Sequence, residues 1–263
     1  MSQALPPTPP THVIFYASCL DDLYFPDAGL AGIQLLERQG IQVIFPQNQT
    51  CCGQPAYSSG FNDQAREVVL AQLEALAGDC PIVLPSGSCA AMMKHHYPEL
   101  FAGTPQAQAI QALADRVWEL SDFLLRVCQI QLQDQGQPIK VAMHTSCSAR
   151  REMGLAETGP QLLDQLSQVE RVEQARASEC CGFGGRFSLR HADISAAMVA
   201  DKAQALKAAG AERFVTTDCG CMMNIAGYTE KQGLGLPGQH LLSFLWERLN
   251  AEGQAPEEAG GRS

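Results

Sequence analysis

Short runs of apolar residues alternate along this chain with longer stretches in which apolar residues recur three and four positions apart. In the first half the runs predict strands and the stretches predict helices, in the order 13–17, 28–39, 41–45, 63–77 and 82–84. In the second half the same order of elements returns at 141–145, 159–168, 169–174, 192–209 and 213–217. The sequence therefore predicts strand, helix, strand, helix, strand, and predicts it twice.

This order indicates an α/β fold of two repeated βαβαβ units, each with a small parallel sheet covered by helices. Between the units we predict one long helix over 106–127 and a polar turn over 133–138. We place the boundary near residue 135, giving units of 12–135 and 136–249. Because each half alone is small, a single composite domain with pseudo-twofold symmetry is the alternative.

Composition narrows the class of protein. The ends of the chain, 1–11 and 250–263, are rich in Pro, Gly, Glu and Ala, and we predict disordered tails there. A formal net charge of −10 argues against nucleic-acid binding. No apolar segment approaches the roughly 20 residues that span a bilayer, so we expect a cytoplasmic protein. Eleven cysteines in a cytoplasmic chain indicate metal or redox chemistry rather than disulfides.

The cysteines repeat in register with the two units. Cys19, the doublet Cys51-Cys52 and Cys89 are matched by a second set, which consists of Cys147, Cys180, Cys181 and Cys221. The first cysteine and the doublet are separated by 31 residues (20–50) in one copy and 32 residues (148–179) in the other. The flanking sequences match too: 12–19 runs parallel to 140–147, and 119–124 resembles 240–245. The chain is therefore an internal duplication built around thiols.

Each of these cysteines follows a predicted strand. The carboxyl ends of parallel strands meet at one edge of a sheet, so the four thiols of each copy should converge. Thiolates hold iron-sulfur clusters, typically four to a cluster. Adjacent cysteines point apart and suit a centre with several irons better than one tetrahedral ion. The glycine after each doublet lets the backbone approach such a centre. Structural zinc in each copy, or thiols that hold no metal, are the alternatives.

Other polar residues near the cysteines are weaker candidates. Arg186 and Arg190 could bind a substrate carboxylate or an acidic partner, although solvated arginines are equally common. His95, His96, His144 and His191 are expected to be hydrogen-bond partners rather than ligands. Cys80 and Cys128 lie outside the repeat and are expected in the core. No phosphate-binding or dinucleotide fingerprint is present, which indicates that the chain binds no organic redox cofactor by itself.

The two cysteine sets, the sequence Cys180-Cys181-Gly182-Phe183-Gly184-Gly185 and the segment 221–225 resemble the CCG cysteine-rich domain. The resemblance covers about 12–249 and is strongest to the lactate utilization protein A family. It extends to the cysteine-rich subunit of heterodisulfide reductase and to the glycolate oxidase iron-sulfur subunit. In the heterodisulfide reductase protein the terminal segment is CxxC. Ser86 and Asp218 occupy the first position of that pair here, which puts the five-thiol, non-cubane cluster in doubt.

The resemblance implies a 4Fe-4S cluster in each copy. The expected ligands of the two clusters are the repeated cysteines: Cys19, Cys51, Cys52, Cys89, Cys147, Cys180, Cys181 and Cys221. Cys219 is a possible replacement for the thiol that is missing from the second copy. The resemblance further implies an electron-transfer subunit of a multi-protein system that oxidises L-lactate to pyruvate, inactive alone. The expected partners are a ferredoxin-like iron-sulfur companion and other lactate utilization proteins. A thiol-disulfide reductase similar to heterodisulfide reductase, a glycolate oxidase subunit and a zinc-stabilised interaction module remain the alternatives.

Overall fold

The computed structural model describes residues 8–250, which form two four-stranded parallel sheets with the same strand order. The first sheet has the order β2-β1-β3-β4 and consists of β1 (His12–Phe15), β2 (Gln42–Ile44), β3 (Ile82–Leu84) and β4 (Val117–Glu119). The second has the order β6-β5-β7-β8 and consists of β5 (Ile139–His144), β6 (Val169–Arg171), β7 (Arg213–Thr216) and β8 (Gly238–His240). The predicted α/β fold with repeated parallel sheets is confirmed, and each sheet has one strand more than predicted.

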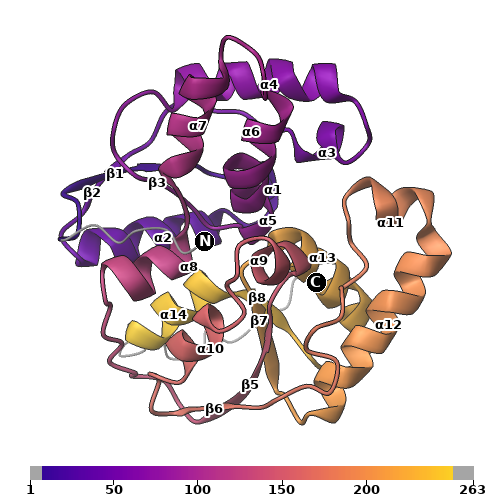
Figure 1. Ribbon diagram of the computed structural model, residues 1–263. Helices are drawn as coiled ribbons and strands as arrows, with labels where there is room; N and C mark the ends of the chain where they lie inside the picture. The colour runs from indigo at the N-terminus through magenta and orange to yellow at the C-terminus, as the bar shows by residue number, and fades with distance from the viewer. Residues whose placement is uncertain (1–7, 251–263) are drawn as a thin grey trace, which may run out of the picture.

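Helices connect the strands in both halves (Figure 1). The first half contains α1 (Cys19–Tyr24), α2 (Pro26–Arg38), α3 (Gln54–Tyr57), α4 (Asn62–Ala75), α5 (Gly87–Ala91), the π-helical turn η1 (Met92–His96), α6 (Tyr97–Leu100), α7 (Ala107–Asp115), α8 (Leu120–Asp122) and the π-helical turn η2 (Phe123–Val127). The second half contains α9 (Cys147–Arg151), α10 (Thr158–Leu163), α11 (Arg186–Arg190), α12 (Ala192–Ala208), α13 (Cys219–Lys231) and α14 (Leu241–Leu249). Residues 1–7 and 251–263, which include most of both predicted tails, lie outside the described residues.

The predicted long helix over 106–127 is wrong. The chain leaves α7 at Asp115, forms β4 beside β3, and re-enters a helical conformation only at Leu120. All three residues of β4 are buried, and Val83 of β3 is in register with Trp118. The helix is interrupted because pairing with β3 satisfies backbone groups that are buried at this edge. The sequence resemblance between 119–124 and 240–245 corresponds to equivalent positions in the two halves. Glu119 and His240 each end the fourth strand of a sheet and cap the helix that follows.

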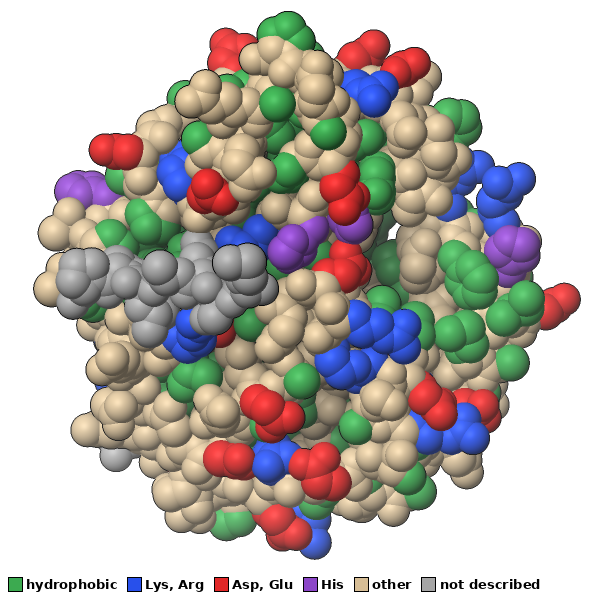
Figure 2. All heavy atoms as spheres, viewed as in Figure 1, with side chains coloured by type: hydrophobic (Ala, Val, Ile, Leu, Met, Phe, Trp, Pro, Cys, Tyr) green, Lys and Arg blue, Asp and Glu red, His purple; other side chains and the backbone are tan. Residues whose placement is uncertain are grey.

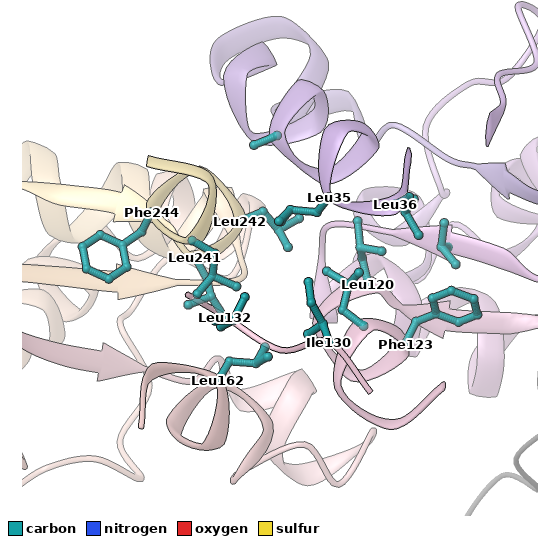
Figure 3. Packing of buried hydrophobic residues seen from close by; sticks show 14 of the residues in the cluster. Leu35, Leu36, Leu120, Phe123, Ile130, Leu132, Leu162, Leu241, Leu242 and Phe244 are labelled. Carbon is teal, nitrogen blue, oxygen red and sulfur yellow. The ribbon is translucent and has the colours of Figure 1, made fainter. Parts of the chain in front are cut away.

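One hydrophobic core joins the two halves. Figure 3 shows Leu35 and Leu36 of α2 on the same cluster as Leu241 and Leu242 of α14, with Leu162 of α10 below them. Residues of the segment after β4 fill the space between these helices, among them Leu120, Phe123, Ile130 and Leu132. The seam between the halves is therefore packed like the interior of a domain rather than like a contact between independent domains.

A buried ion pair fixes the connecting segment to the last helix. Arg248 donates to both carboxylate oxygens of Asp134, at 2.7 and 2.9 Å, and also to Gln137 O at 2.7 Å. The Asp134 side chain is fully buried and that of Arg248 is 5% exposed. A pair with so many hydrogen bonds holds one geometry, so the segment around our proposed boundary at residue 135 is attached to α14 and is not a free linker.

Candidate metal centre

A cavity of about 310 Å³ lies between the two halves, and all eight repeated cysteines line it. Its wall also includes residues of α3 from the first half and Phe183, Gly184 and Gly185, which precede α11, from the second. Figure 2 shows a hollow on this face of the molecule, between the segments that Figure 1 labels α3 and α11. The predicted convergence of the cysteines at the carboxyl ends of the strands therefore extends across both sheets, because the two sets face one shared space.

The thiols of each half form two close pairs in the same order. In the first half, Cys19 Sγ lies 3.8 Å from Cys51 Sγ, and Cys52 Sγ lies 3.3 Å from Cys89 Sγ. In the second half, Cys147 is hydrogen-bonded to Cys180 and Cys181 to Cys221, and in both halves the two doublet thiols are also hydrogen-bonded to each other. Each pair thus joins one thiol of the doublet to one distant cysteine. Two adjacent cysteines that point to different partners fit a centre with several metal positions in each half.

Hydrogen bonds between these thiols shift their pKa values in opposite directions. The hydrogen bond from Cys19, with a further one to Cys52, lowers the pKa of Cys51 to about 2, although burial opposes the shift. The hydrogen bond to Cys51 and burial raise the pKa of Cys19 well above its ordinary value. The hydrogen bonds thus favour the thiolate form of Cys51 among its neighbouring thiols. Since the thiolate is the form that binds metal, the site presents a ready ligand in the first half.

Serine caps position two of the helices that carry cysteines. Ser86 Oγ accepts a hydrogen bond from Cys89 N at 3.4 Å, and Ser146 Oγ accepts one from Ala149 N at 3.2 Å. The short helices α5 and α9 therefore begin beside the cavity, because Ser86, Ser88, Ser146 and Ser148 line it, and the serine caps fix the backbone that carries Cys89 and Cys147.

The glycines after the two doublets are required by backbone conformation. Gly53 has φ +83° and Gly182 has φ +86°, in the region that favours glycine. A Cβ atom on Gly182 would lie 2.8 Å from Ser195 O, and Gly182 N donates to Cys180 Sγ at 3.4 Å. The doublet loop is thus packed tightly against α12. In this loop the backbone amide of Gly182 donates a hydrogen bond to the sulfur of Cys180, a candidate ligand.

The two positions at which this chain departs from CxxC contact each other. Ser86 Oγ donates to Asp218 Oδ1 at 3.1 Å, across the seam between the halves. The same oxygen accepts from Ser88 Oγ at 2.6 Å and from Ser88 N at 3.1 Å. Asp218 Oδ2 is buried and has no hydrogen-bond partner among the described residues. The substitutions therefore replace two thiols by a polar bridge between the halves.

Cys219 lines the cavity but lies in a different group from the repeated cysteines. Its thiol hydrogen-bonds Asp21 of α1, and one ligand atom each of Asp21, Cys219 and His240 lie within 4.8 Å of one another. Burial and the nearby Asp21 carboxyl raise the pKa of Cys219 above its ordinary value. The structure thus holds Cys219 as a protonated thiol at the seam. Its proposed use as a replacement ligand would require that hydrogen bond to be given up.

His144 differs from what we expected of it. The ring is 1% exposed, and neither nitrogen has a hydrogen-bond partner among the described residues. One ring nitrogen lies within 4.8 Å of both Cys181 Sγ and Cys221 Sγ. Burial, with Lys202 and Arg150 nearby, lowers the pKa of His144 to about 3, so the imidazole is neutral. The prediction that His144 is a hydrogen-bond partner is therefore wrong.

The other predicted polar residues lie away from the thiols. His96 pairs with Glu99 and Glu152, and His191 is exposed on the surface. Neither Arg186 nor Arg190 lines the cavity; the guanidinium of Arg186 lies 5.4 Å from the ring centroid of Phe61 and Arg190 is exposed. Arg186 does, however, contact the other half of the molecule, to which Phe61 belongs.

Two buried polar side chains behind the doublets were not predicted. Gln72 of α4 donates to Thr50 Oγ1 at 2.7 Å and to Cys51 O at 3.2 Å. In the second half, Lys202 of α12 donates to Gln174 Oε1 at 3.1 Å and to Arg176 O. Each lies on the first long helix after the doublet of its half, α4 or α12. A polar residue on the apolar face of that helix was the sequence signal that could have identified it. The second half therefore carries a buried cation where the first carries a neutral amide.

Comparison with known proteins agrees with this geometry. The family model described as "CCG: Cysteine-rich domain" matches residues 13–94 and 141–226. The chain is 38% identical over 237 residues to "Lactate utilization protein A" of Geobacillus thermodenitrificans, which covers 90% of this chain and 99% of the relative. It is 35% identical over 240 residues to "Lactate utilization protein A 2" of Bacillus cereus, which covers 90% of this chain and 99% of that relative.

A solved structure shows the same fold. A hypothetical protein from Helicobacter pylori superimposes with a TM-score of 0.58 at 10% sequence identity over 98% of this chain, which spans about half (52%) of that protein. Within residues 8–250, none of the helices combines the length and the apolar character that a bilayer span requires. The repeated cysteine sets, their shared cavity and the matches over nine tenths of the chain lead to one assignment: the chain belongs to the CCG cysteine-rich domain family, together with the lactate utilization A proteins.

Proposed function

We propose that this protein is the iron-sulfur electron-transfer subunit of a multi-protein system that oxidises L-lactate to pyruvate. The observation that supports this most is the shared cavity, into which two matched sets of four thiols converge from segments more than a hundred residues apart. Soft thiolate donors in sets of four fit iron-sulfur clusters. The names of the relatives supply lactate as the substrate of the system.

In this proposal each half holds one 4Fe-4S cluster. The ligands of the first are Cys19, Cys51, Cys52 and Cys89, and those of the second are Cys147, Cys180, Cys181 and Cys221. When bound, such clusters accept and release electrons one at a time. The chain itself orients the thiols through the capped helices and excludes water with its apolar walls. Electrons would come from companion proteins of the lactate system, one of them ferredoxin-like.

Metal analysis tests the cofactor. Protein purified without oxygen should contain about eight iron and eight acid-labile sulfide per chain, as two 4Fe-4S clusters require. The variant Cys51→Ser/Cys52→Ser should lose about half of both, because it removes two ligands of one set. Cys128→Ser, which removes a thiol outside the repeat and away from the cavity, should lose neither. Zinc without sulfide would contradict the proposal.

A reduction assay tests the substrate. L-lactate should bleach the visible absorption of the protein only when the companion proteins are present. Glycolate, offered at the same concentration, should bleach it more slowly. Equal rates for the two acids would assign the subunit to a broader 2-hydroxy acid system, and bleaching by glycolate alone would contradict the lactate assignment.

A further inference from the structure

We propose that the surface beside the thiol cavity is the docking site of a small acidic electron-transfer protein. We call this surface the rim; it consists of residues 54–61 of the first half and residues 183–191 of the second. This inference rests on the proposed function, since a centre that relays electrons needs a partner where its cavity approaches the surface. It goes beyond that function by naming the surface and the charge of the protein that binds there.

Both segments of the rim begin in the wall of the cavity and continue to the outside of the molecule. Residues of α3 line the cavity from the first half, and Phe183, Gly184 and Gly185 line it from the second. The first segment ends at Phe61, which is 49% exposed, and the second contains α11, of which no residue is buried. The hollow in Figure 2 lies between these two segments. A protein bound to the rim would therefore lie beside the thiols.

The charge of the rim is opposite to that of the whole molecule. Segment 183–191 contains Arg186, Arg190 and His191 and no acid, and segment 54–61 contains no charged residue, although the chain has a formal net charge of −10. The nearest acids along the chain, Asp63 and Asp193, lie in the first turns of α4 and α12, where acids complement the helix dipole. The rim is therefore a local basic surface on an acidic protein.

The two arginines of the rim are not paired within the chain. Among residues 8–250, the guanidinium of Arg186 contacts the ring of Phe61, and neither Arg186 nor Arg190 makes a hydrogen bond or an ion pair. They are four residues apart on α11, where like charges destabilise a helix. Many other arginines do contact a carboxylate: Arg66, Arg126, Arg171, Arg176, Arg213 and Arg248. The rim arginines are thus available to acidic groups of another protein.

Exposed apolar side chains accompany these arginines. Leu189 lies between them in the sequence and is 83% exposed, and Ile194, in the first turn of α12, is 55% exposed. Figure 2 shows basic and apolar side chains together over the segment that Figure 1 labels α11. Protein interfaces combine apolar contacts with arginine, and a basic surface steers an acidic partner toward it. Electron-transfer complexes are typically small and weak, so a limited surface of this kind is sufficient.

Calorimetric titration with an acidic plant-type ferredoxin tests the rim. The wild-type protein should bind this ferredoxin in about 0.1 M salt and lose most of the binding in about 1 M salt, where the Debye length falls to about 3 Å. Arg186→Glu/Arg190→Glu should weaken binding about tenfold or more, because attraction becomes repulsion. Leu189→Ala should weaken it about threefold through lost apolar contact. All of these side chains are partly or fully exposed, and an unchanged urea midpoint verifies that each variant folds.

Arg38→Glu/Lys207→Glu is the matched control. It changes the net charge of the chain by the same amount, at two exposed positions in the last turns of α2 and α12, and α12 begins beside the rim and ends away from it. In about 0.1 M salt the Debye length is about 10 Å, so these distant charges should change binding by no more than about twofold.

The outcomes separate this inference from the proposed function. Absence of ferredoxin binding, binding that survives Arg186→Glu/Arg190→Glu, or equal losses in the two double variants would overturn the docking site. None of these titrations requires a cluster in this chain, so the content of iron and sulfide judges the proposed function independently. Zinc without sulfide, together with binding that depends on the rim, would overturn the proposed function and leave the rim as a binding surface for an acidic protein.

Discussion

Gly53 and Gly182 occupy equivalent positions after the two doublets, yet their surroundings differ. Both have a positive φ, which disfavours any residue with a side chain. A Cβ on Gly53 would meet a methyl group of Val68 at 3.4 Å, which is an ordinary contact, whereas on Gly182 it would meet the backbone oxygen of Ser195 at 2.8 Å. The second doublet loop therefore has no room for a side chain.

This difference predicts an order of stabilities. Gly182→Ala should lower the free energy of unfolding by about 2 kcal/mol or more, because strain and a backbone clash add. Gly53→Ala should cost about 1–2 kcal/mol through strain alone. Gly227→Ala, in the interior of α13 with open space around it, should be neutral or add up to about 1 kcal/mol. Urea unfolding measures all three, and an equal cost at Gly53 and Gly182 would contradict the packing argument.

Glu119 makes stability depend on pH. Burial raises its pKa to about 7, although hydrogen bonds from Ser121 and Asp122 N oppose the shift. In the unfolded chain this carboxyl ionises near pH 4.3. The folded state therefore loses stability as the pH rises from about 4.3 to about 7, and the loss is complete above pH 7. Glu119→Gln removes this pH-dependent loss of stability, because the amide does not ionise. The stability of this variant relative to wild type should grow by about 3 kcal/mol between pH 4.5 and 8. A difference that stays constant with pH would show that Glu119 is ionised in the folded protein.

At the scale of elements, periodicity found six of the eight strands and the helices α2, α4, α10 and α12, and it missed β4, β8 and most of the other helices of the described residues. The prediction of 82–84 as a strand coincides with β3, and 192–209 differs from α12 by one residue. β4 has three residues between helical segments rich in Ala and Leu, so its pattern is too short to outweigh theirs. Only pairing with β3, a contact distant in sequence, makes it a strand.

The same distinction applies to the candidate site. The eight cysteines could be found from the sequence because their spacing repeats, and the structure brings them to one cavity. His144 was noticed as a neighbour of the cysteines, but its place could not be predicted, because a single histidine near a cysteine has no spacing that repeats. Its separation from Cys181 and Cys221 depends on how β5 lies against the doublet loop and α13, which is a property of packing.

The pair of helices α2 and α14 should be the main energetic link between the halves. Leu242→Ala removes a fully buried side chain from their shared cluster and should cost about 2–5 kcal/mol. Leu30 also lies on α2, but it is 56% exposed, so Leu30→Ala should change the free energy of unfolding by no more than about 0.5 kcal/mol. Thermal or urea unfolding measures both. Equal effects would mean that the seam contributes little to stability.

For the whole molecule, a core that crosses the seam predicts one cooperative transition. The chain has two tryptophans, Trp118 on β4 and Trp246 on α14, one in each half. Fluorescence of Trp246→Phe reports on the first half, and that of Trp118→Phe reports on the second. Once the change in stability caused by each substitution is subtracted, the two urea midpoints should coincide. Separate transitions would favour two independent domains that meet near residue 135.

Since both halves line the cavity, its wall is completed only late in synthesis. The four thiols of the first half leave the ribosome long before Cys221, and α14, which holds the halves together, is the last described helix of the chain. A nascent first half therefore presents its thiols on an open surface, where oxidation or a foreign metal can reach them. Any machinery that loads this protein has its widest access during translation, before α14 docks and closes the seam.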